Sequence, residues 1–147
     1  MQGNLLLRRL YIFPATLAAV VMTTANASAQ MYAPGSLPNS RELTDTLTEK
    51  DIPTGLGGFA RDYTVYLENG DQVAIDVTSE EFDTLVSLMD TSGTTVSEND
   101  DGPDGTTNSL LFARITESGT YTVRVRSYAG QGTGQFFLKV ARLREVQ

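Results

Sequence analysis

The feature that most constrains the fold of this chain is a succession of short alternating segments separated by turn residues. In residues 62–67, Tyr63, Val65 and Leu67 alternate with Thr64 and other neighbours that face the opposite way. A period of two residues is typical of a β-strand with one buried face. About eight segments show this pattern, at residues 42–48, 62–67, 72–78, 84–90, 94–98, 109–115, 119–128 and 134–142. No stretch after residue 29 keeps a helical period for two turns, so we predict an all-β fold.

The spacing of these segments predicts how they pack. They lie roughly ten residues apart, with Gly, Asn or Ser in nearly every gap, which is typical of an antiparallel β-sandwich. Asn69 and Gly70 stand between residues 62–67 and 72–78. Because both residue types tolerate positive φ, this pair predicts a β-hairpin with a type I′ turn.

The N-terminal residues predict export. Residues 1–29 have the form of a signal peptide, with Arg8 and Arg9 before an apolar run and small residues near the predicted cleavage site. The apolar run, residues 10–22, is shorter than the roughly 20 residues that span a bilayer. We therefore expect a secreted or periplasmic protein that is not held in a membrane after cleavage. A flexible lead-in is expected at residues 30–40, followed by a single domain at residues 41–147.

Composition excludes several kinds of chemistry. The chain has no Cys and no His, which rules out a Ser-His-Asp triad, a thiol nucleophile, an imidazole or thiolate zinc site and a disulfide. The net charge is −7 and becomes −9 once Arg8 and Arg9 are removed with the signal. This field repels nucleic acid and anionic lipid. The oxygen ligands that remain suit a hard cation such as calcium.

The residues richest in candidate ligands form an acidic corner. Residues 98–108 contain four acidic and two amide side chains, broken by Gly and Pro. If residues 84–90 and 94–98 form a hairpin, its register places Asp83 opposite Asp100 or Asp101. Carboxylates that converge in this way repel one another unless a cation lies between them.

Two interpretations of this corner stay open. One is a calcium site, with Asp83, Asn99, Asp100, Asp101 and Asp104 as the candidate ligands. The other is a solvated loop whose Asp and Asn side chains form turns with their own backbone. The EF-hand spacing fits with neither Gly102 nor Gly105 at the position of the conserved glycine.

Two further groups of side chains have a structural interpretation that we favour over a functional one. Arg124 and Arg126 share an outward strand face, where solvated charges are more common than a site for an acidic ligand. The tyrosines Tyr32, Tyr66 and Tyr128 could form a stacking platform, although packing is the more ordinary role of each.

The chain resembles the bacterial pre-peptidase C-terminal domain in a series of short motifs. These are residues 69–73, 81–85, 88–90, 98–102, 108–109, 118–123, 127–128 and Gly134, in the same order and spacing across about residues 41–142. The resemblance implies a jelly-roll-like β-sandwich of the kind appended to exported peptidases, in which some relatives carry calcium. It carries a ligand role to Asp83, Asn99, Asp100 and Asp101, whereas Asp104 is added from the composition of the loop.

The expected function follows from the resemblance and from the excluded chemistry. We expect no enzyme but a secreted binding or structural module, a stand-alone copy of the domain, for which calcium is the candidate cofactor and an extracellular polymer the candidate partner. The alternative is an accessory factor acting in trans on a secreted peptidase, in its secretion, maturation or inhibition. A hydrolase using Asp83 and Asp101 is disfavoured, because no cleft is predicted around them.

Overall fold

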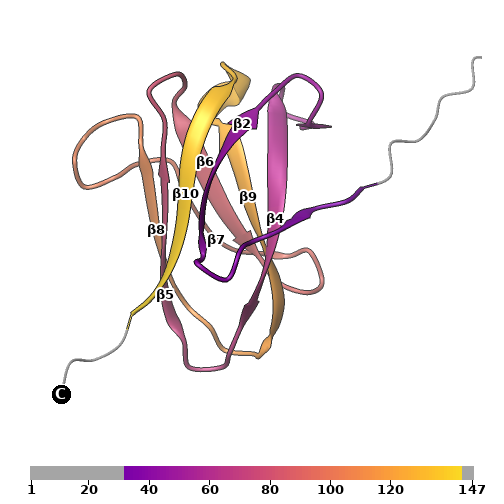
Figure 1. The fold of residues 1–147 in the computed structure, drawn as a ribbon, viewed down its shortest axis with the longest axis vertical. Helices are drawn as coiled ribbons and strands as arrows, with labels where there is room; N and C mark the ends of the chain where they lie inside the picture. The colour runs from indigo at the N-terminus through magenta and orange to yellow at the C-terminus, as the bar shows by residue number, and fades with distance from the viewer. Residues whose placement is uncertain (1–31, 144–147) are drawn as a thin grey trace, which may run out of the picture. The chain divides into compact units, whose positions relative to one another are not determined.

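The computed structural model describes residues 32–143, so the predicted signal peptide at residues 1–29 lies outside the described residues. Ten strands form within this range (Figure 1). They are β1 (Gly35–Ser36), β2 (Glu42–Leu47), β3 (Ile52–Pro53), β4 (Phe59–Leu67), β5 (Gln72–Thr78), β6 (Thr84–Met89), β7 (Thr95–Asn99), β8 (Ser109–Arg114), β9 (Gly119–Ser127) and β10 (Gly134–Leu143). A single 3₁₀ turn, η1 (Tyr128–Gly130), follows β9. No helix in residues 32–143 is long and apolar enough to cross a membrane.

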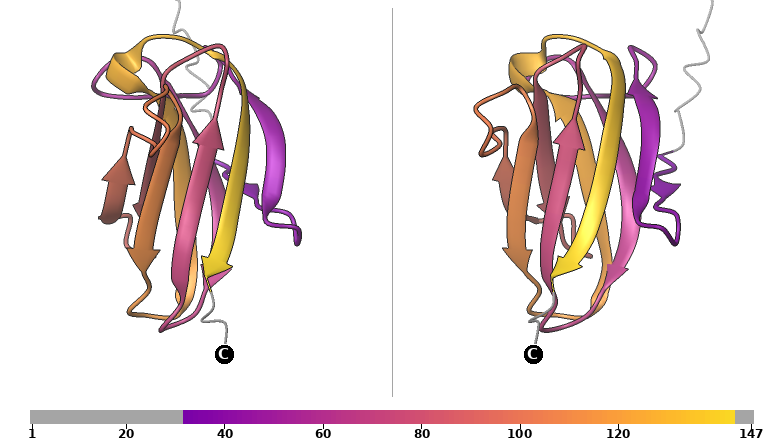
Figure 2. Two further views of the ribbon diagram at one scale, coloured as in Figure 1. Left: turned by 90° about the vertical axis from the view of Figure 1, so that its left-hand side faces the viewer. Right: turned by 60° about the vertical axis from the view of Figure 1, so that its left-hand side comes forward.

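The strands form two sheets that face each other (Figure 2). One sheet has the order β1-β4-β9-β6-β7, with β3 also paired to β4, and the other has the order β2-β10-β5-β8. Every pairing is antiparallel except that of β1 with β4. The all-β sandwich is thereby confirmed. Its eight longer strands match the predicted segments, and the additional strands β1 and β3 have two residues each, too few to show an alternating pattern.

The core lies between the sheets and is built from the alternating positions. The buried side chains include Tyr63, Val65, Leu67, Val73, Ile75, Val77, Val86, Leu88, Leu111, Tyr121, Val123, Val125, Phe136, Leu138 and Val140. The Phe136 ring meets the rings of Tyr63 and Phe82 edge to face, each at 6.3 Å between centroids. Full burial of each large aliphatic side chain contributes about 1.5–3 kcal/mol, so this layer provides most of the drive to fold.

The hairpin predicted at Asn69-Gly70 is wrong. Strands β4 and β5 belong to different sheets, so the chain crosses from one sheet to the other at this turn. Gly70 has a φ of 89°, but Asn69 is not among the residues of positive φ, so the turn is not type I′. Instead, Asp71 N–H donates to the Glu68 carbonyl at 3.0 Å, and Gly70 N–H donates to the Ile115 carbonyl at 2.8 Å. The local sequence specified a tight turn, while pairing with distant strands decided where β4 and β5 lie.

The lead-in predicted at residues 30–40 also differs from the structure. β1 pairs with β4, and Leu37 N–H donates to the Thr64 carbonyl at 2.9 Å. The Leu37 side chain is only 8% exposed and belongs to the core. Burial of this apolar group is what holds residues 35–37 against the sheet. The chain then turns toward β2 at Arg41, whose φ is 59°.

Candidate functional site

Three of the predicted ligands meet at one end of the sandwich. Asp83 immediately precedes β6, and Asp100 and Asp101 immediately follow its antiparallel partner β7. The pairing of Val86 with Asn99 differs by one residue from the predicted register, because a β-bulge lies between Leu88 and Met89. We call Asp83, Asp100 and Asp101 the acidic tip.

The electrostatics of the acidic tip show that these charges interact. Partial burial raises the pKa of Asp83, and repulsion by Asp100 and then by Asp101 raises it further. Within residues 32–143, no lysine or arginine forms an ion pair with any of the three carboxylates. The tip therefore presents negative charge that the described part of the chain does not neutralise.

Asn99 holds the loop after β7 in place. Its side-chain Nδ2 donates to the carbonyls of Asp101 and Leu110, both at 2.8 Å. Its Oδ1 accepts from the N–H of Asp100 at 3.1 Å. The amide of this predicted ligand is thus engaged with the backbone, and its evident effect is to fix the two aspartates that follow it.

Asp104 lies apart from the acidic tip. Gly105 N–H closes a turn onto the Gly102 carbonyl at 3.3 Å, and Asp104 Oδ1 accepts the N–H of Thr106 at 3.3 Å. The bonds from Thr106 lower the pKa of Asp104. Its charge acts on Asp76 of β5, whose pKa is raised first by burial and then by Asp104. Asp104 therefore lies on the side of the sandwich that carries β5.

The five candidate residues are not assembled into one coordination sphere. Among residues 32–143, no group of three or more acidic side chains is arranged so that it could hold a metal ion.

Asp90 takes the role expected of a turn residue, since its Oδ1 accepts the N–H groups of Ser92 at 2.8 Å and Thr94 at 3.0 Å.

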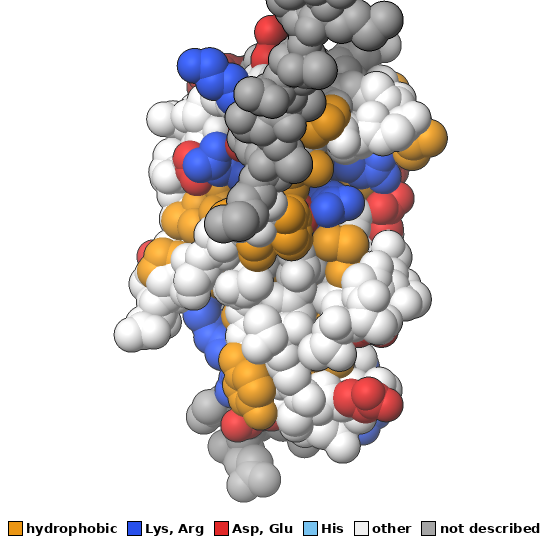
Figure 3. Space-filling model, turned by 90° about the vertical axis from the view of Figure 1, so that its right-hand side faces the viewer, with side chains coloured by type: hydrophobic (Ala, Val, Ile, Leu, Met, Phe, Trp, Pro, Cys, Tyr) orange, Lys and Arg blue, Asp and Glu red, His pale blue; other side chains and the backbone are white. Residues whose placement is uncertain are grey.

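The two arginines of the outward strand face are both paired with acidic residues of the chain. Arg124 of β9 forms a bidentate pair with Asp62 of β4, at 2.8 Å and 2.7 Å. Asp62 is only 3% exposed, and its Oδ2 also accepts from the Tyr32 hydroxyl at 2.6 Å. Arg126 pairs with Glu98 of β7 at 3.1 Å. Figure 3 shows basic and acidic side chains next to one another, around hydrophobic side chains, on the side of the molecule that carries β1 and β4.

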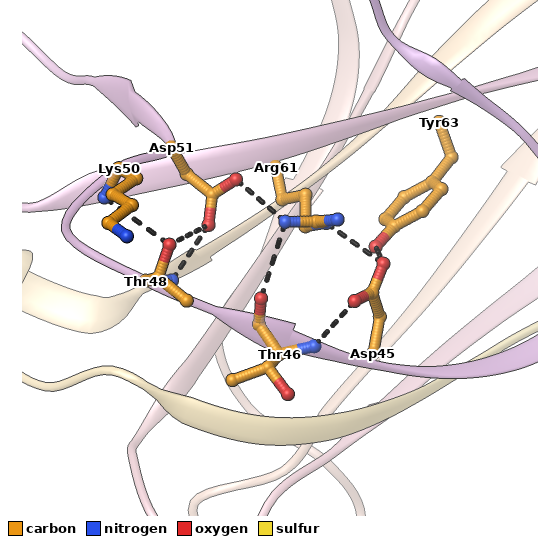
Figure 4. Close-up of polar contacts among 7 residues, drawn as sticks. All are labelled: Asp45, Thr46, Thr48, Lys50, Asp51, Arg61 and Tyr63. Carbon is orange, nitrogen blue, oxygen red and sulfur yellow. Dashed lines mark hydrogen bonds and ion pairs between the residues drawn. The ribbon is translucent and has the colours of Figure 1, made fainter.

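A second charged cluster, which sequence reasoning did not identify, joins the two sheets. Arg61 of β4 contacts Asp45 of β2 through Nε at 2.9 Å and Asp51 through Nη1 at 2.8 Å (Figure 4). The Tyr63 hydroxyl donates to Asp45 Oδ2 at 2.8 Å. We call Arg61, Asp45, Asp51 and Tyr63 the Arg61 clamp. One feature of the sequence could have indicated this cluster. Arg61 lies two residues before Tyr63, so its side chain is on the same face of β4 as the buried positions.

The pKa shifts in the clamp follow from its hydrogen bonds. Burial raises the pKa of Tyr63, and the hydrogen bond to the Asp45 carboxylate raises it further. Burial by itself would raise the pKa of Asp45, but donors from Tyr63, Thr46 and Arg61 outweigh that effect and lower it. The clamp is therefore a satisfied network whose evident role is to hold β2 against β4.

Comparison with known proteins agrees with this architecture. Residues 60–127 match the family model of the bacterial pre-peptidase C-terminal domain. The fold is similar to that of the pre-peptidase C-terminal domain of a Bacillus anthracis collagenase, with 14% identity, a TM-score of 0.55 and coverage of 74% of this chain and 95% of that chain. No match was found among curated proteins.

Two inhibitors share the fold as well. PliG of Aeromonas hydrophila, a periplasmic inhibitor of g-type lysozyme, is 14% identical with a TM-score of 0.53, covering 74% of this chain and 96% of that chain. PliG of Salmonella Typhimurium is 11% identical with a TM-score of 0.50, covering 75% and 98%. At this level of identity the likeness concerns the fold alone. The family match over residues 60–127 and the sandwich topology agree in their likeness to the bacterial pre-peptidase C-terminal domain.

Proposed function

We propose that this chain is an exported, non-catalytic binding module that contacts its partner through the acidic tip. The pre-peptidase C-terminal domain is a non-catalytic module of peptidases, which supports a role without turnover. The observation that carries the proposal is the convergence of Asp83, Asp100 and Asp101 without a compensating cation from residues 32–143. Converging negative charge raises the rate and selectivity of encounter with a basic surface. The partner would be an extracellular polymer or a secreted peptidase.

The test is capture of a partner from culture medium by the immobilised chain. We expect the triple variant Asp83→Asn, Asp100→Asn, Asp101→Asn to lose the captured partner. A matched control, Glu42→Gln, Glu49→Gln, Glu117→Gln, removes the same charge from exposed positions outside the tip loops. Equal capture by the triple variant and by the unaltered chain would contradict the proposal.

Calcium is our proposed means of neutralising the acidic tip. The tip supplies carboxylates of the type that calcium prefers, but its side chains would have to draw together, because they form no ready metal cluster. Calcium at 100 times its dissociation constant would stabilise the fold by about 2.7 kcal/mol. We expect a higher Tm with calcium, lost in Asp83→Ala and Asp101→Ala and kept in Asp104→Asn. An identical Tm in calcium and in chelator would remove calcium from the proposal.

The second candidate is an accessory factor that acts in trans on an exported hydrolase. The fold shared with two PliG structures favours it, because both of those proteins are inhibitors of an enzyme. Inhibition of the captured hydrolase, measured against substrate with and without the chain, would separate this role from simple attachment to a polymer.

A further inference from the structure

A polar pocket lies at the end of the sandwich opposite the acidic tip. Thr120, at the start of β9, lines the pocket, while Ser127, at the other end of β9, pairs with Thr84 next to Asp83. The pocket has a volume of about 460 Å³ and is lined by the turn between β1 and β2 together with the ends of β4, β9 and β10. Its two cationic side chains are Arg41 and Arg142, so we call it the arginine pocket.

Arg41 adopts a backbone conformation that its residue type disfavours. Its N–H donates to the Pro38 carbonyl at 2.8 Å, its carbonyl accepts from Val140 at 2.8 Å, and its φ is 59°. Glycine or asparagine occupies such left-handed positions at far lower energy. The strained backbone therefore carries a side chain that this turn does not require.

The Arg41 guanidinium is incompletely bonded. Nη2 donates to the Tyr66 carbonyl at 3.4 Å, which is a long contact, while Nη1 is buried without a hydrogen-bond partner among the described residues. Burial and then repulsion by Arg142 lower the pKa of Arg41. A buried, unpaired N–H of a charged group is unfavourable, so the pocket holds a donor that lacks its acceptor.

Arg142 pairs with acidic residues of its own chain, although its Nε, like Arg41 Nη1, is buried without a hydrogen-bond partner among the described residues. Its Nε lies 3.0 Å from Asp71 Oδ2, its Nη1 lies 3.5 Å from Glu68 Oε2, and its Nη2 donates to the Tyr66 carbonyl at 3.2 Å. The carboxylates of Glu68 and Asp71 thus pair with Arg142 and also attract Arg41. Arg41 itself forms no ion pair among the described residues.

We propose that the arginine pocket binds a ligand carboxylate, which accepts hydrogen bonds from the Arg41 guanidinium. A guanidinium recognises a carboxylate through short, charge-assisted bonds. A monoanion fits better than a phosphate dianion, because Glu68 and Asp71 already place negative charge beside Arg142. The ring of Tyr66, which is 55% exposed, provides apolar surface for the carbon atoms attached to the carboxylate. This site goes beyond the proposed function, since it needs neither the acidic tip nor calcium.

The test is titration of the purified chain, followed by NMR, with N-acetylglutamate and with its neutral isostere N-acetylglutamine. We expect saturable binding of N-acetylglutamate with a Kd on the order of 1–10 mM, and none of the isostere. Glucuronate, titrated in parallel, distinguishes a sugar acid from an acidic side chain as the source of the carboxylate, and binding of either one supports the proposal.

The decisive variant is Arg41→Asn, because asparagine tolerates the left-handed backbone while removing the guanidinium. We expect it to weaken binding at least about tenfold, equivalent to about 1.4 kcal/mol, and to raise Tm in the absence of ligand. The control Arg114→Gln removes the same charge from an exposed position of β8 and should bind as the unaltered chain does.

Four outcomes would overturn the proposal, the first three of which come from the variants and the phosphate control. These three are a lower Tm for Arg41→Asn with unchanged binding, equal loss of binding in Arg114→Gln, and tighter binding of inorganic phosphate than of either carboxylate. Absence of saturable binding to the unaltered chain would do the same. Failure of partner capture at the acidic tip would leave this site unaffected, so the two proposals can fail separately.

Discussion

Carboxylates that are paired across the sheets and carboxylates at the acidic tip have opposite kinds of charged neighbours. In the Arg61 clamp and in the Asp62–Arg124 pair, each carboxylate meets a guanidinium within 3 Å. At the tip, the charged groups of residues 32–143 that act on Asp83 are the carboxylates of Asp100 and Asp101. A buried charge without a partner is too unfavourable to persist, whereas a charge at a loop end stays hydrated. The difference teaches that the carboxylates of these pairs hold strands together, while those at the tip form no ion pair with the described residues.

The largest change in the free energy of unfolding should come from breaking the buried ion pair between Asp62 and Arg124. Asp62→Ala leaves Arg124 partly buried without its carboxylate, and we expect the free energy of unfolding to fall by about 3 kcal/mol. Denaturant unfolding at pH 7 measures it. Asp100→Ala, which removes a tip carboxylate, should change stability by no more than about 0.5 kcal/mol. Similar losses from both substitutions would remove the distinction between the two regions.

A smaller effect is expected within the Arg61 clamp. Tyr63→Phe keeps the buried ring but removes the hydrogen bond to Asp45, so the free energy of unfolding should fall by about 1 kcal/mol. Tyr66→Phe is the matched control, since Tyr66 is exposed. A double-mutant cycle with Asp45→Asn should show coupling between Asp45 and Tyr63. Additive losses would mean that the hydroxyl and the carboxylate act independently.

The smallest change in the free energy of unfolding should come from a substitution at the acidic tip, and it should be a gain instead of a loss. Asp83→Asn relieves repulsion by Asp100 and Asp101, so we expect it to raise the free energy of unfolding at pH 7 by about 0.5 kcal/mol. Stability measured from pH 3 to pH 7 checks this value and its pH dependence.

The pH dependence of this gain follows from the direction of the Asp83 shift. Its pKa in the folded state lies above the ordinary value of 3.8, so the native state holds the proton more tightly than the unfolded state. The favourable contribution of Asp83 is complete below 3.8 and is lost as pH rises through the raised pKa. The Asp83→Asn gain should therefore grow across that window. A gain that stays constant from pH 3 to pH 7 would contradict the electrostatic account.

Local periodicity predicted the strands well, because each strand has to bury one face. It could not predict the pairing of strands that are not neighbours in the sequence. The Asn69-Gly70 turn was interpreted as a hairpin, yet β4 and β5 belong to different sheets, in which β4 pairs with β9 and β5 pairs with β8 and β10. Strand β1 was missed because a strand of two residues cannot show an alternating pattern. Its place beside β4 depends on pairing with that strand and on the burial of Leu37.

The candidate site was predictable to the extent that it depends on a local hairpin. β6 and β7 are consecutive, so the approach of Asp83 to Asp100 and Asp101 followed from one turn and one register. Asp104 was grouped with them by composition, but the turn at residues 102–105 directs it toward Asp76. Nothing local identifies Arg41, because the pocket around it combines segments that lie up to about a hundred residues apart.

The order in which the chain visits the two sheets has a consequence for folding. β2, near the beginning of the domain, pairs with β10 at its end, and β5 fits between β10 and β8. The second sheet thus lacks β10, one of its two central strands, until the last strand has been synthesised. Such long-range pairing is typical of domains that fold in milliseconds to seconds. Truncation before Gly134 should consequently yield a chain that stays sensitive to proteases.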